Sequence, residues 1–563
     1  MSHRARLLYL RVSGLVLIVA CAFSGCAGMR RTRPSRPVAG GIKSLPLQLQ
    51  AFERMADGKL VVTWQGDPDY DYTLSVAPVL GHSELFYPLR TMVSDSTPVR
   101  TVTNAISPLG SCFYRMTQNS AIGAALVLSD VHLNPFASTN VVTQLVARSH
   151  TEWREVLAPL TNEAFFAKSE WNESVTSYKL FNSALNNAQA AVPEPDFILY
   201  LGDYPVHDFR DHFIAYTGDS SDAGFESFAY KLMGFVGDEV ARRFPGKPVF
   251  AILGNNDTYD DDYQQTPEGA YFEDVAGLFF TNGLSNAAAY ASFAPDFQKG
   301  GYYSVGMGTG VQMVALCANF LSVLYTNPSG FAEYDPATNQ LQFLEQELAA
   351  CAGEGKGAWV LVHIVPGVDA YATYHAWDRV GPITNVVEMW KDEYLRQFMD
   401  IVTRHSNVVR QVFCGHTHMR EFRLLSDPEY SNVVAAVHVA PGIDYSHGNN
   451  PAFQVLTYDR GSFAVLGSVT FALSRAKYTG VTGPAVWDQV FSYNPSFDIH
   501  SFAWPVMSGV YADLTNSPSR YQTYRTIYET GSGRDSIHAT NWPVYSTAIR
   551  WMLATQFMEH FTP

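Results

Sequence analysis

Seven short apolar runs between residues 124 and 439 constrain the fold of this chain more than any other feature. They read AALVLSD, FILYLGD, VFAILGN, QMVALC, AWVLVH, RQVFCGH and VVAAVHV, and stretches with helical spacing separate them. Apolar runs that alternate with amphipathic helices predict an α/β domain. One such helix is expected where Leu341, Leu344, Leu348 and Cys351 share a face, and the glycine-rich stretch 353–357 should end it.

Five of these runs end in side chains that can bind a metal ion. The donors are Asp130 with His132, Asp203, Asn255, His363, and His416 with His418. In open α/β sheets ligands bind beyond the carboxyl ends of the strands, so we expect the donors to converge there. A single histidine at a strand end is most often a packed or surface residue. Five runs with the same kind of ending indicate a shared site.

The chemistry of these donors indicates what they bind. Imidazole, carboxylate and amide groups without a thiolate suit a divalent ion such as zinc, manganese or iron. Seven donors exceed one tetrahedral shell, so two ions that share a carboxylate are the economical interpretation. Such ions, roughly 3.5–4 Å apart, activate a hydroxide and stabilise an in-line displacement at phosphorus. The residues therefore predict a dinuclear centre for phosphoryl chemistry.

The order DxH, GD, GNxD, an isolated histidine and GHTH resembles the signature of the calcineurin-like metallophosphoesterases. Within that superfamily, residues 124–475 are similar to the acid sphingomyelinase-like phosphodiesterases. The similar stretches are GDYPVH, LCANFLSVLYTNPSG, HIVPG, CGHTHMREF and NNPAFQVLTYD. The resemblance implies a four-layer core of two β-sheets flanked by helices. It also implies hydrolysis of phosphodiesters by attack of a metal-bridging hydroxide.

The resemblance further implies a role for each donor. One ion would be held by Asp130, His132, Asp203 and His418, and the other by Asp203, Asn255, His363 and His416. Where the family carries a histidine that protonates the leaving oxygen, this chain has Asn256. An amide cannot supply a proton at neutral pH, although it can hydrogen-bond a phosphate oxygen. His207, at the position of a second family histidine, is therefore the expected general acid.

Several alternatives stay open at this level. A phosphomonoesterase, such as a nucleotidase, or a polyphosphatase would share the metal ligands and differ only in its pocket. The departure at Asn256 also fits a metal-binding surface lipoprotein without turnover, whereas retention of all seven donors favours an enzyme. The acidic stretch 260–262 either faces the cleft or forms a solvated loop, and His438 and His447 either line the cleft or belong to plain loop structure.

The N-terminus resembles a bacterial lipoprotein signal peptide spanning residues 1–25. Arginines precede an apolar stretch from Val12 to Phe23 that is too short for a bilayer-spanning helix. Small residues then lead to Cys26, which would be acylated and become the mature N-terminus; Phe23 departs from the usual leucine. Ordinary secretion or an uncleaved anchor is the alternative. We expect an exported lipoprotein, anchored in the outer or cell membrane through Cys26, with residues 26–41 as a tether.

The net charge excludes one class of partner. It is −15 for the whole chain, and seven arginines lie within the first 38 residues, which leaves −22 for the remainder. Such an acidic body repels polyanions, so sequence-independent binding to a nucleic-acid backbone is not expected. The expected partner is instead a small phosphoester, and the oligomeric state stays open.

Two regions flank the catalytic domain, which is expected to span residues 121–475. Short alternating segments from 42 to 120 predict a small β-sandwich. Residues 476–563 are rich in tryptophan and tyrosine and predict a helical segment packed on the core. No CxxC pattern is present, so Cys317, Cys351 and Cys414 are expected to be small buried hydrophobic residues.

Overall fold

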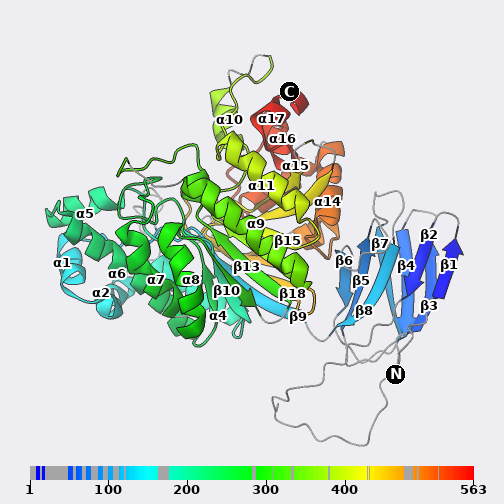
Figure 1. The fold of residues 1–563 in the computed structure, drawn as a ribbon, viewed down its shortest axis with the longest axis horizontal. Coiled ribbons are helices and arrows are strands. Elements are labelled where there is room, and N and C mark those ends of the chain that lie inside the picture. The colour runs from blue at the N-terminus through cyan, green and yellow to red at the C-terminus, as the bar shows by residue number, and fades with distance from the viewer. Residues whose placement is uncertain are drawn as a thin grey trace, which may run out of the picture.

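All seven apolar runs form strands, which lie in two six-stranded sheets of the computed structural model (Figure 1). The structure describes strand residues within 8–19 and 48–119. It also describes 122–562, apart from 163–175, 282–286, 308–309, 331–334, 378, 380, 428, 430–431, 475–484, 486, 491–492 and 518. The expected lipidation site Cys26 and the tether lie outside the described residues. The signal-like stretch is described only at 8–12 and 15–19.

The first sheet contains the first three runs and has the strand order β11-β10-β9-β18-β19-β20. β9, β10 and β11 are parallel, and three antiparallel strands complete the sheet. The bounds are β9 Ile122–Leu128, β10 Phe197–Tyr200, β11 Val249–Ala251, β18 Ala452–Asp459, β19 Val465–Ala472 and β20 Asp488–Val490.

The second sheet contains the other four runs and has the order β12-β13-β14-β15-β17-β16. Its four inner strands are parallel, whereas the edge strands β12 and β16 are antiparallel to their neighbours. The bounds are β12 Tyr303–Met307, β13 Val311–Leu316, β14 Gly357–Val362, β15 Val409–Cys414, β16 Glu421–Ser426 and β17 Val433–Val439.

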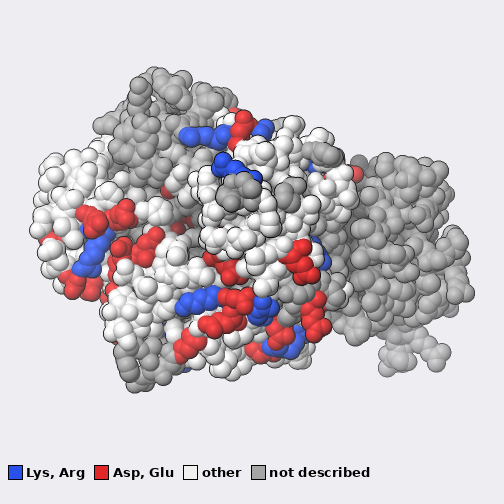
Figure 2. Space-filling view, turned by 90° about the horizontal axis from the view of Figure 1, so that it is seen from above, with Lys and Arg blue, Asp and Glu red and all other residues white. Residues whose placement is uncertain are grey.

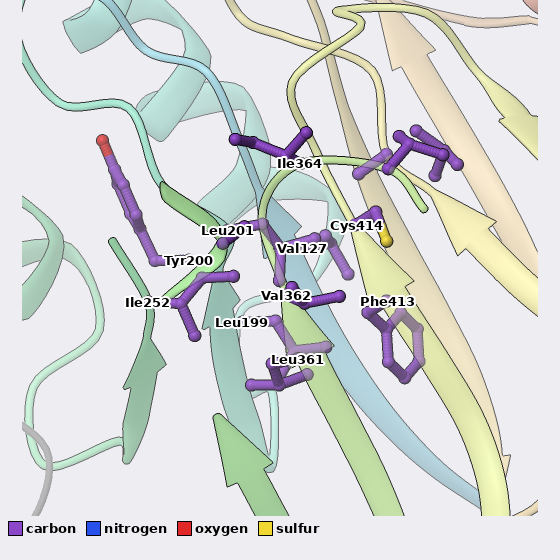
Figure 3. Packing of buried hydrophobic residues seen from close by; sticks show 14 of the residues in the cluster. Val127, Leu199, Tyr200, Leu201, Ile252, Leu361, Val362, Ile364, Phe413 and Cys414 are labelled. Atoms are coloured by element: carbon purple, nitrogen blue, oxygen red, sulfur yellow. The ribbon is translucent and has the colours of Figure 1, made fainter. Parts of the chain in front are cut away.

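The core lies between the two sheets, where side chains of β9 and β10 meet those of β14 and β15 (Figure 3). Trp359 of β14 is fully buried, and its ring contacts Phe197 of β10 with 5.7 Å between the ring centroids. The hydroxyl of Tyr303 donates a hydrogen bond of 2.7 Å to the carbonyl of Ala251 in the other sheet. The expected pair of packed sheets is therefore confirmed.

Helices flank both sheets, as expected. α9 and α11 contact the second sheet, and α4 contacts β18 of the first. The helices before the C-terminal segment are α1 Thr139–Ala147, α2 Trp153–Leu157, α4 Tyr178–Ala191, α5 Phe209–Thr217, α6 Asp222–Arg243, α7 Ala270–Thr281, α8 Ala287–Gly300, α9 Pro336–Glu354, α10 Ala370–Ala376 and α11 Asp392–Arg404. α9 is the helix predicted from leucine spacing; Asp335 caps its first turn, and Gly355 ends it with a φ of 67°.

The N-terminal strands form a separate group beside the α/β body (Figure 1). Two three-stranded antiparallel sheets, β3-β4-β7 and β6-β5-β8, occupy the region where a small β-sandwich is expected. The bounds are β3 Gln48–Arg54, β4 Lys59–Gln65, β5 Asp71–Ala77, β6 Tyr87–Met92, β7 Val99–Ala105 and β8 Phe113–Asn119. Ahead of them, β1 Leu8–Val12 pairs with β2 Leu15–Val19.

The C-terminal segment is mainly helical, but it also contains β20, which extends the edge of the first sheet. This strand was not predicted, because β20 is only three residues long and its pairing with β19 is not visible in the sequence pattern. The helices are α13 Tyr493–Phe497, α14 Trp504–Asn516, α15 Arg520–Tyr528, α16 Trp542–Arg550 and α17 Ala554–His560.

Two smaller findings complete the description. Cys317, Cys351 and Cys414 are buried free thiols, as predicted. Among the residues that the structure describes, no helix combines the length and the apolar character needed to cross a bilayer.

A buried ion pair fixes the C-terminal segment to the core. Arg423 of β16 contacts Glu421 at 2.9 Å, and both side chains are 3% exposed. The same guanidinium donates hydrogen bonds to the carbonyl oxygens of Ala548 in α16 at 2.7 Å and of Val368 at 3.2 Å. One side chain of the second sheet thus holds a helix that lies 125 residues further along the chain.

We expect Arg423→Met to lower the free energy of unfolding by about 3–5 kcal/mol, because it leaves the buried carboxylate of Glu421 without its cation. Urea denaturation measures the change. The double variant Arg423→Met/Glu421→Met should regain part of the loss. Arg396→Met is the matched control, because its pair with Asp392 is largely exposed and should contribute at most about 1 kcal/mol. Equal losses in Arg423→Met and Arg396→Met would contradict the anchoring role.

Candidate active site

The seven predicted donors come together at the carboxyl edges of the two sheets. They follow five parallel strands: Asp130 and His132 follow β9, Asp203 follows β10, Asn255 follows β11, His363 follows β14, and His416 and His418 follow β15. Three groups have potential ligand atoms within 4.8 Å of one another: Asp130, His132 and Asp203; Asp203, His363 and His416; and His132, His207 and His418. Asp203 and His132 each belong to two of these groups, and Asp203 is the carboxylate that two of them share.

The loops that present the donors adopt an unfavourable backbone conformation. The φ angle is positive at five of the seven donors, with values of 47° at Asp130, 45° at His132, 49° at Asp203, 74° at His416 and 58° at His418. A residue with a side chain in this region costs on the order of 1–3 kcal/mol, and such strain concentrates at functional sites. The site therefore requires a backbone conformation that is locally unfavourable.

Gly202 allows two of these loops to approach each other. Its φ is 98°, and a Cβ atom at this position would lie 2.6 Å from Nδ1 of His363 and 2.7 Å from the amide nitrogen of Gly254. Only glycine fits such a position, because any side chain would collide with backbone as well as with the histidine. The glycine of the GD motif thus brings the loops after β10, β11 and β14 into contact.

The carboxylate of Asp203 lies between two histidines and is 1% exposed. Its Oδ2 is 3.3 Å from Nε2 of His132 and 3.2 Å from Nε2 of His363. Burial alone would raise its pKa, but the charges of these histidines hold the pKa of Asp203 well below its usual range. The backbone amide of Asn256 donates to its other oxygen at 2.9 Å. Asp203 is therefore an anion fixed from several sides.

The carboxylate of Asp130 is fully buried on the neighbouring side of the site. Its Oδ1 accepts a hydrogen bond of 2.9 Å from the amide of His416 and lies 3.5 Å from Nε2 of His418. Its other oxygen accepts a hydrogen bond from the hydroxyl of Ser129. Burial raises the pKa of Asp130 to about 6. A cation bound at the site would therefore stabilise the ionised form of this carboxylate.

In two histidines of the site, the hydrogen bond made by Nδ1 determines whether Nε2 carries a lone pair. Nδ1 of His132 lies 3.0 Å from the carbonyl oxygen of Pro205, and Nδ1 of His363 lies 2.5 Å from that of Leu201. A carbonyl only accepts, so each Nδ1 carries the proton and donates it. In the neutral ring, Nε2 then presents a lone pair. Both Nε2 atoms are buried and have no hydrogen-bond partner.

A positive charge must lie between these lone pairs and the carboxylate of Asp203, because lone pairs repel an anionic oxygen at 3.2–3.3 Å. Protons can supply it: burial opposes the charged rings, yet Asp203 raises the pKa of His132 to about 10 and that of His363 to about 9. A divalent cation supplies it more directly, since a backbone carbonyl on the outer nitrogen is the usual support of a metal-binding histidine. The donor set therefore fits a bound metal.

Asn255 and His416 form the side of the site nearest the solvent. The amide oxygen of Asn255 lies 2.8 Å from Nδ1 of His416, and its amide nitrogen donates to Asp262 at 2.6 Å. Asp262 thus fixes which end of the amide faces the site, a role that the sequence did not reveal. Within the acidic stretch 260–262, Asp262 lines the cavity, as expected if the stretch faced the cleft. Asp261 is exposed, as expected of a solvated loop.

His207 lines the cavity, and Asn256 is buried beside it. The ring of His207 stacks on that of His132, with 4.4 Å between the centroids. Burial lowers the pKa of His207 to about 4, and Asn256 hydrogen-bonds to it. The side-chain nitrogen Nδ2 of Asn256 also donates a hydrogen bond to Oδ2 of Asp203 at 3.1 Å. Asn256 therefore connects the central carboxylate to the histidine expected to act as the acid.

Two buried carboxylates support the site and were missed by the sequence analysis. Asp257 accepts hydrogen bonds from the backbone amides of Gly254 at 2.6 Å, Asp203 at 3.1 Å and Tyr204 at 2.8 Å, which ties the loops after β10 and β11 together. Asp444 is fully buried, and its charge helps to raise the pKa of His132. The LGNND motif contained Asp257, but its role depends on a loop more than 50 residues away.

The two remaining histidines have different environments. His447 lines the cavity and contacts His418, with 4.7 Å between the ring centroids. His438 is fully buried in β17, and its Nε2 lies 2.8 Å from Oε1 of Gln454. The suggestion that both could line the cleft is therefore wrong for His438, because its ring packs against Phe413 and Phe502 in the core.

A cavity of about 630 Å³ opens from the donors toward the C-terminal segment. Its inner end is lined by Asp203, His207, Asn255, His416 and His418. Its outer walls are lined by residues of α10 and by residues between 528 and 545, which include Tyr371, Tyr374, Tyr528, Arg534, His538 and Tyr545. The site is thus a deep cleft with polar donors at one end and aromatic and polar side chains around the rest.

Comparisons with known proteins agree with this geometry. A family model described as calcineurin-like phosphoesterase matches residues 124–420, more than half of the chain. Acid sphingomyelinase-like phosphodiesterase 3b from Homo sapiens is 24% identical, covering 62% of this chain and 71% of the relative. Cyclic GMP-AMP phosphodiesterase SMPDL3A from Mus musculus is 25% identical, covering 67% and 78%. Sphingomyelinase phosphodiesterase C from Dictyostelium discoideum is 24% identical, covering 64% and 77%.

These matches confirm the resemblance that the sequence motifs indicated. Members of the matched family use divalent metal ions, and the structure brings together histidine and carboxylate groups that could hold them. The buried Nε2 atoms of His132 and His363, which have no hydrogen-bond partner, fit a bound cation as well. The chain therefore belongs to the calcineurin-like phosphoesterase family and is a metal-dependent phosphoric ester hydrolase.

Proposed function

We propose that the protein is an exported, membrane-tethered phosphodiesterase with a dinuclear metal centre. The carrying observation is the position of Asp203, whose carboxylate faces two buried histidine nitrogens that have no hydrogen-bond partner. One ion would be held by Asp130, His132, Asp203 and His418, and the other by Asp203, Asn255, His363 and His416. Nitrogen and oxygen donors without thiolate suit zinc, with manganese or iron as alternatives.

The bound ions would supply an activated water as nucleophile and would neutralise the oxygens of the phosphoryl group. The chain's own residues position the reaction. Asp257 holds the loops that carry Asp203, and Asp262 directs the oxygen of Asn255 inward. Asn256, next to the central carboxylate, is in reach of a phosphate oxygen and would donate a hydrogen bond to it. His207, which lines the cavity, would give a proton to the leaving oxygen.

The size of the cavity favours a diester over a monoester. A monoester needs room for one alcohol group, whereas a cavity of about 630 Å³ extends well beyond the donors. The relatives are named for diesters that include sphingomyelin and cyclic GMP-AMP, and their names support the same reaction class. A nucleotidase or polyphosphatase reaction is the alternative, because it would use the same donors.

The surface charge supports a small substrate. On the face shown in Figure 2, basic side chains lie beside acidic ones and form no continuous basic area. Arg404, for example, is paired with both Glu345 and Asp400. A nucleic-acid backbone requires a basic surface, so we infer that the substrate is a small phosphoester that enters the cavity.

We expect the reconstituted protein to bind two divalent ions per chain and to hydrolyse bis-p-nitrophenyl phosphate faster than p-nitrophenyl phosphate. Metal analysis and release of p-nitrophenol measure the two properties. Asp203→Asn should weaken both ions, because it removes charge from the shared ligand. A content below one ion per chain would refute the enzyme proposal, and a loss confined to one ion in Asp203→Asn would refute the shared carboxylate.

His207→Ala should lower kcat by about 10²–10⁴-fold on diesters with a poor, alkoxide-like leaving group, which is the usual contribution of a positioned acid. The effect on p-nitrophenyl esters should be much smaller, because p-nitrophenolate departs without a proton. His207 is neutral before substrate binds, and the negative charge of a bound phosphate favours its protonated form. Steady-state kinetics on both substrate classes measures the split.

Asn256→His is the complementary variant, since it restores the histidine that the family carries at this position. Activity on poor leaving groups should rise. If His207→Ala instead reduces both substrate classes equally while the metal content is preserved, the acid role is rejected. A bound water would then be the proton source, or the protein would be a metal-binding surface lipoprotein without turnover.

We also propose that Cys26 is acylated and that residues 26–41 tether the body to the outer or cell membrane, on its periplasmic or outer face. A single acyl chain holds a membrane only marginally, so stable anchoring requires more than one. We expect mass spectrometry of the mature N-terminus to find a multiply acylated Cys26. An unmodified Cys26, or cleavage at another position, would rule the tether out, while Cys26→Ser should release the protein into the soluble fraction.

A further inference from the structure

One wall of the cavity has no counterpart in the matched family region. Residues between 528 and 545 contribute Tyr528, Arg534, Ser536, His538, Asn541 and Tyr545 to the lining. The family model ends at residue 420, so it does not cover these side chains. They lie where the part of a substrate that is not the reacting phosphate would be placed.

The loop between α15 and α16 is held in position by two buried side chains. Glu529 is 1% exposed and accepts hydrogen bonds from the amides of Arg534 at 3.1 Å and Ser536 at 2.6 Å. Asn541 is 2% exposed, accepts from the amide of His538 at 2.7 Å and donates to the carbonyl of Ser536 at 2.8 Å. The loop therefore has a fixed shape before any ligand binds, which lowers the entropic cost of binding.

Arg534 lies in the outer wall of the cavity, beside Gly448. Its Cγ is 3.5 Å from the position that a Cβ atom of Gly448 would occupy. Gly448 follows His447, whose ring contacts His418. Arg534 therefore borders the stretch of chain that also carries His447.

The guanidinium of Arg534 has no acceptor among the residues that the structure describes. The adjacent acid, Asp535, is engaged elsewhere, since it pairs with Arg525 at 2.6 Å. The other arginine that lines the cavity, Arg423, is paired with Glu421. Arg534 is also exposed, so it was not placed here to stabilise the fold.

The carboxylates of the cavity, by contrast, already accept hydrogen bonds from the protein. The donors are the amide of Asn256 to Asp203, the side chain of Asn255 to Asp262, the amide of Ala372 to Asp369, and the side chain of Arg423 to Glu421. Each acid of the cavity therefore has at least one donor from the protein, whereas the guanidinium of Arg534 is left to find its acceptor in an incoming anion.

We propose that Arg534 binds a second anionic group of the substrate, a phosphate or a carboxylate, at a distance from the reacting phosphodiester. A guanidinium offers two parallel donors that match either group. The inference rests on the proposed function and narrows its substrate class: the preferred diester carries a negative charge on one of its alcohol groups. Ser536 and His538, from the same loop, add polar contacts around that group.

The test compares two series of ligands on the metal-reconstituted protein by calorimetry. Alkylphosphonates carry only the group that binds at the metals, and ω-carboxyalkylphosphonates of the same chain length add one carboxylate. Scanning the chain length finds the compound that reaches Arg534. At that length the carboxylate compound should bind about tenfold more tightly than its alkyl partner, as expected for a charge-assisted pair.

Arg534→Gln should abolish this tenfold difference and leave the Kd of the alkylphosphonates unchanged. Arg404→Gln is the matched control: it removes the same charge at α11, outside the cavity, and should preserve the difference. Equal Kd values within every pair of the unmodified protein, or a difference that survives in Arg534→Gln, would overturn the proposal. Because calorimetry measures binding without turnover, failure to hydrolyse diesters would count against the proposed function alone.

Discussion

The buried carboxylate of Asp203 is the constraint around which the molecule is organised. Placing an anion in a dry interior costs several kcal/mol unless positive charge and hydrogen-bond donors surround it. Here the backbone amide of Asn256 donates to one oxygen, and two histidine nitrogens face the other. Asp130 adds a second buried acid nearby. Packing alone could not hold these groups together, so the cluster is stable only with protons or metal ions between its members.

Much of the fold could be predicted because the strands of the core are short and apolar, and five of the seven runs are closed by a polar residue. The pattern cannot say which strands share a sheet, since both sheets present equally apolar runs. The motif resemblance implied two sheets, and the structure shows which strands belong to each. β20 escaped prediction because its pairing with β19 depends on an edge formed elsewhere. Pairing information of this kind is non-local and leaves no period in the sequence.

The candidate site was likewise predictable only in part. Donors at strand ends could be read from the sequence, because parallel strands bring their carboxyl ends to one edge. The residues that orient these donors could not be identified from the sequence. Asp257 and Asp262 follow the GNN motif as ordinary turn residues, and only the fold shows that one ties two loops together and the other directs Asn255. The lining contributed by Arg534 was invisible for the same reason, since its contact with Gly448 joins distant parts of the chain.

The C-terminal wall of the cavity is also the last part of the cleft to be synthesised. The donors end at residue 418, whereas the far side of the cavity is completed by residues up to 545. During synthesis more than a hundred residues must emerge after the last donor before the cleft has both of its sides. Until α16 docks on the ion pair of Arg423, the nascent chain has a reactive edge without a specificity wall. The complete cleft therefore requires the C-terminal residues as well as the donors.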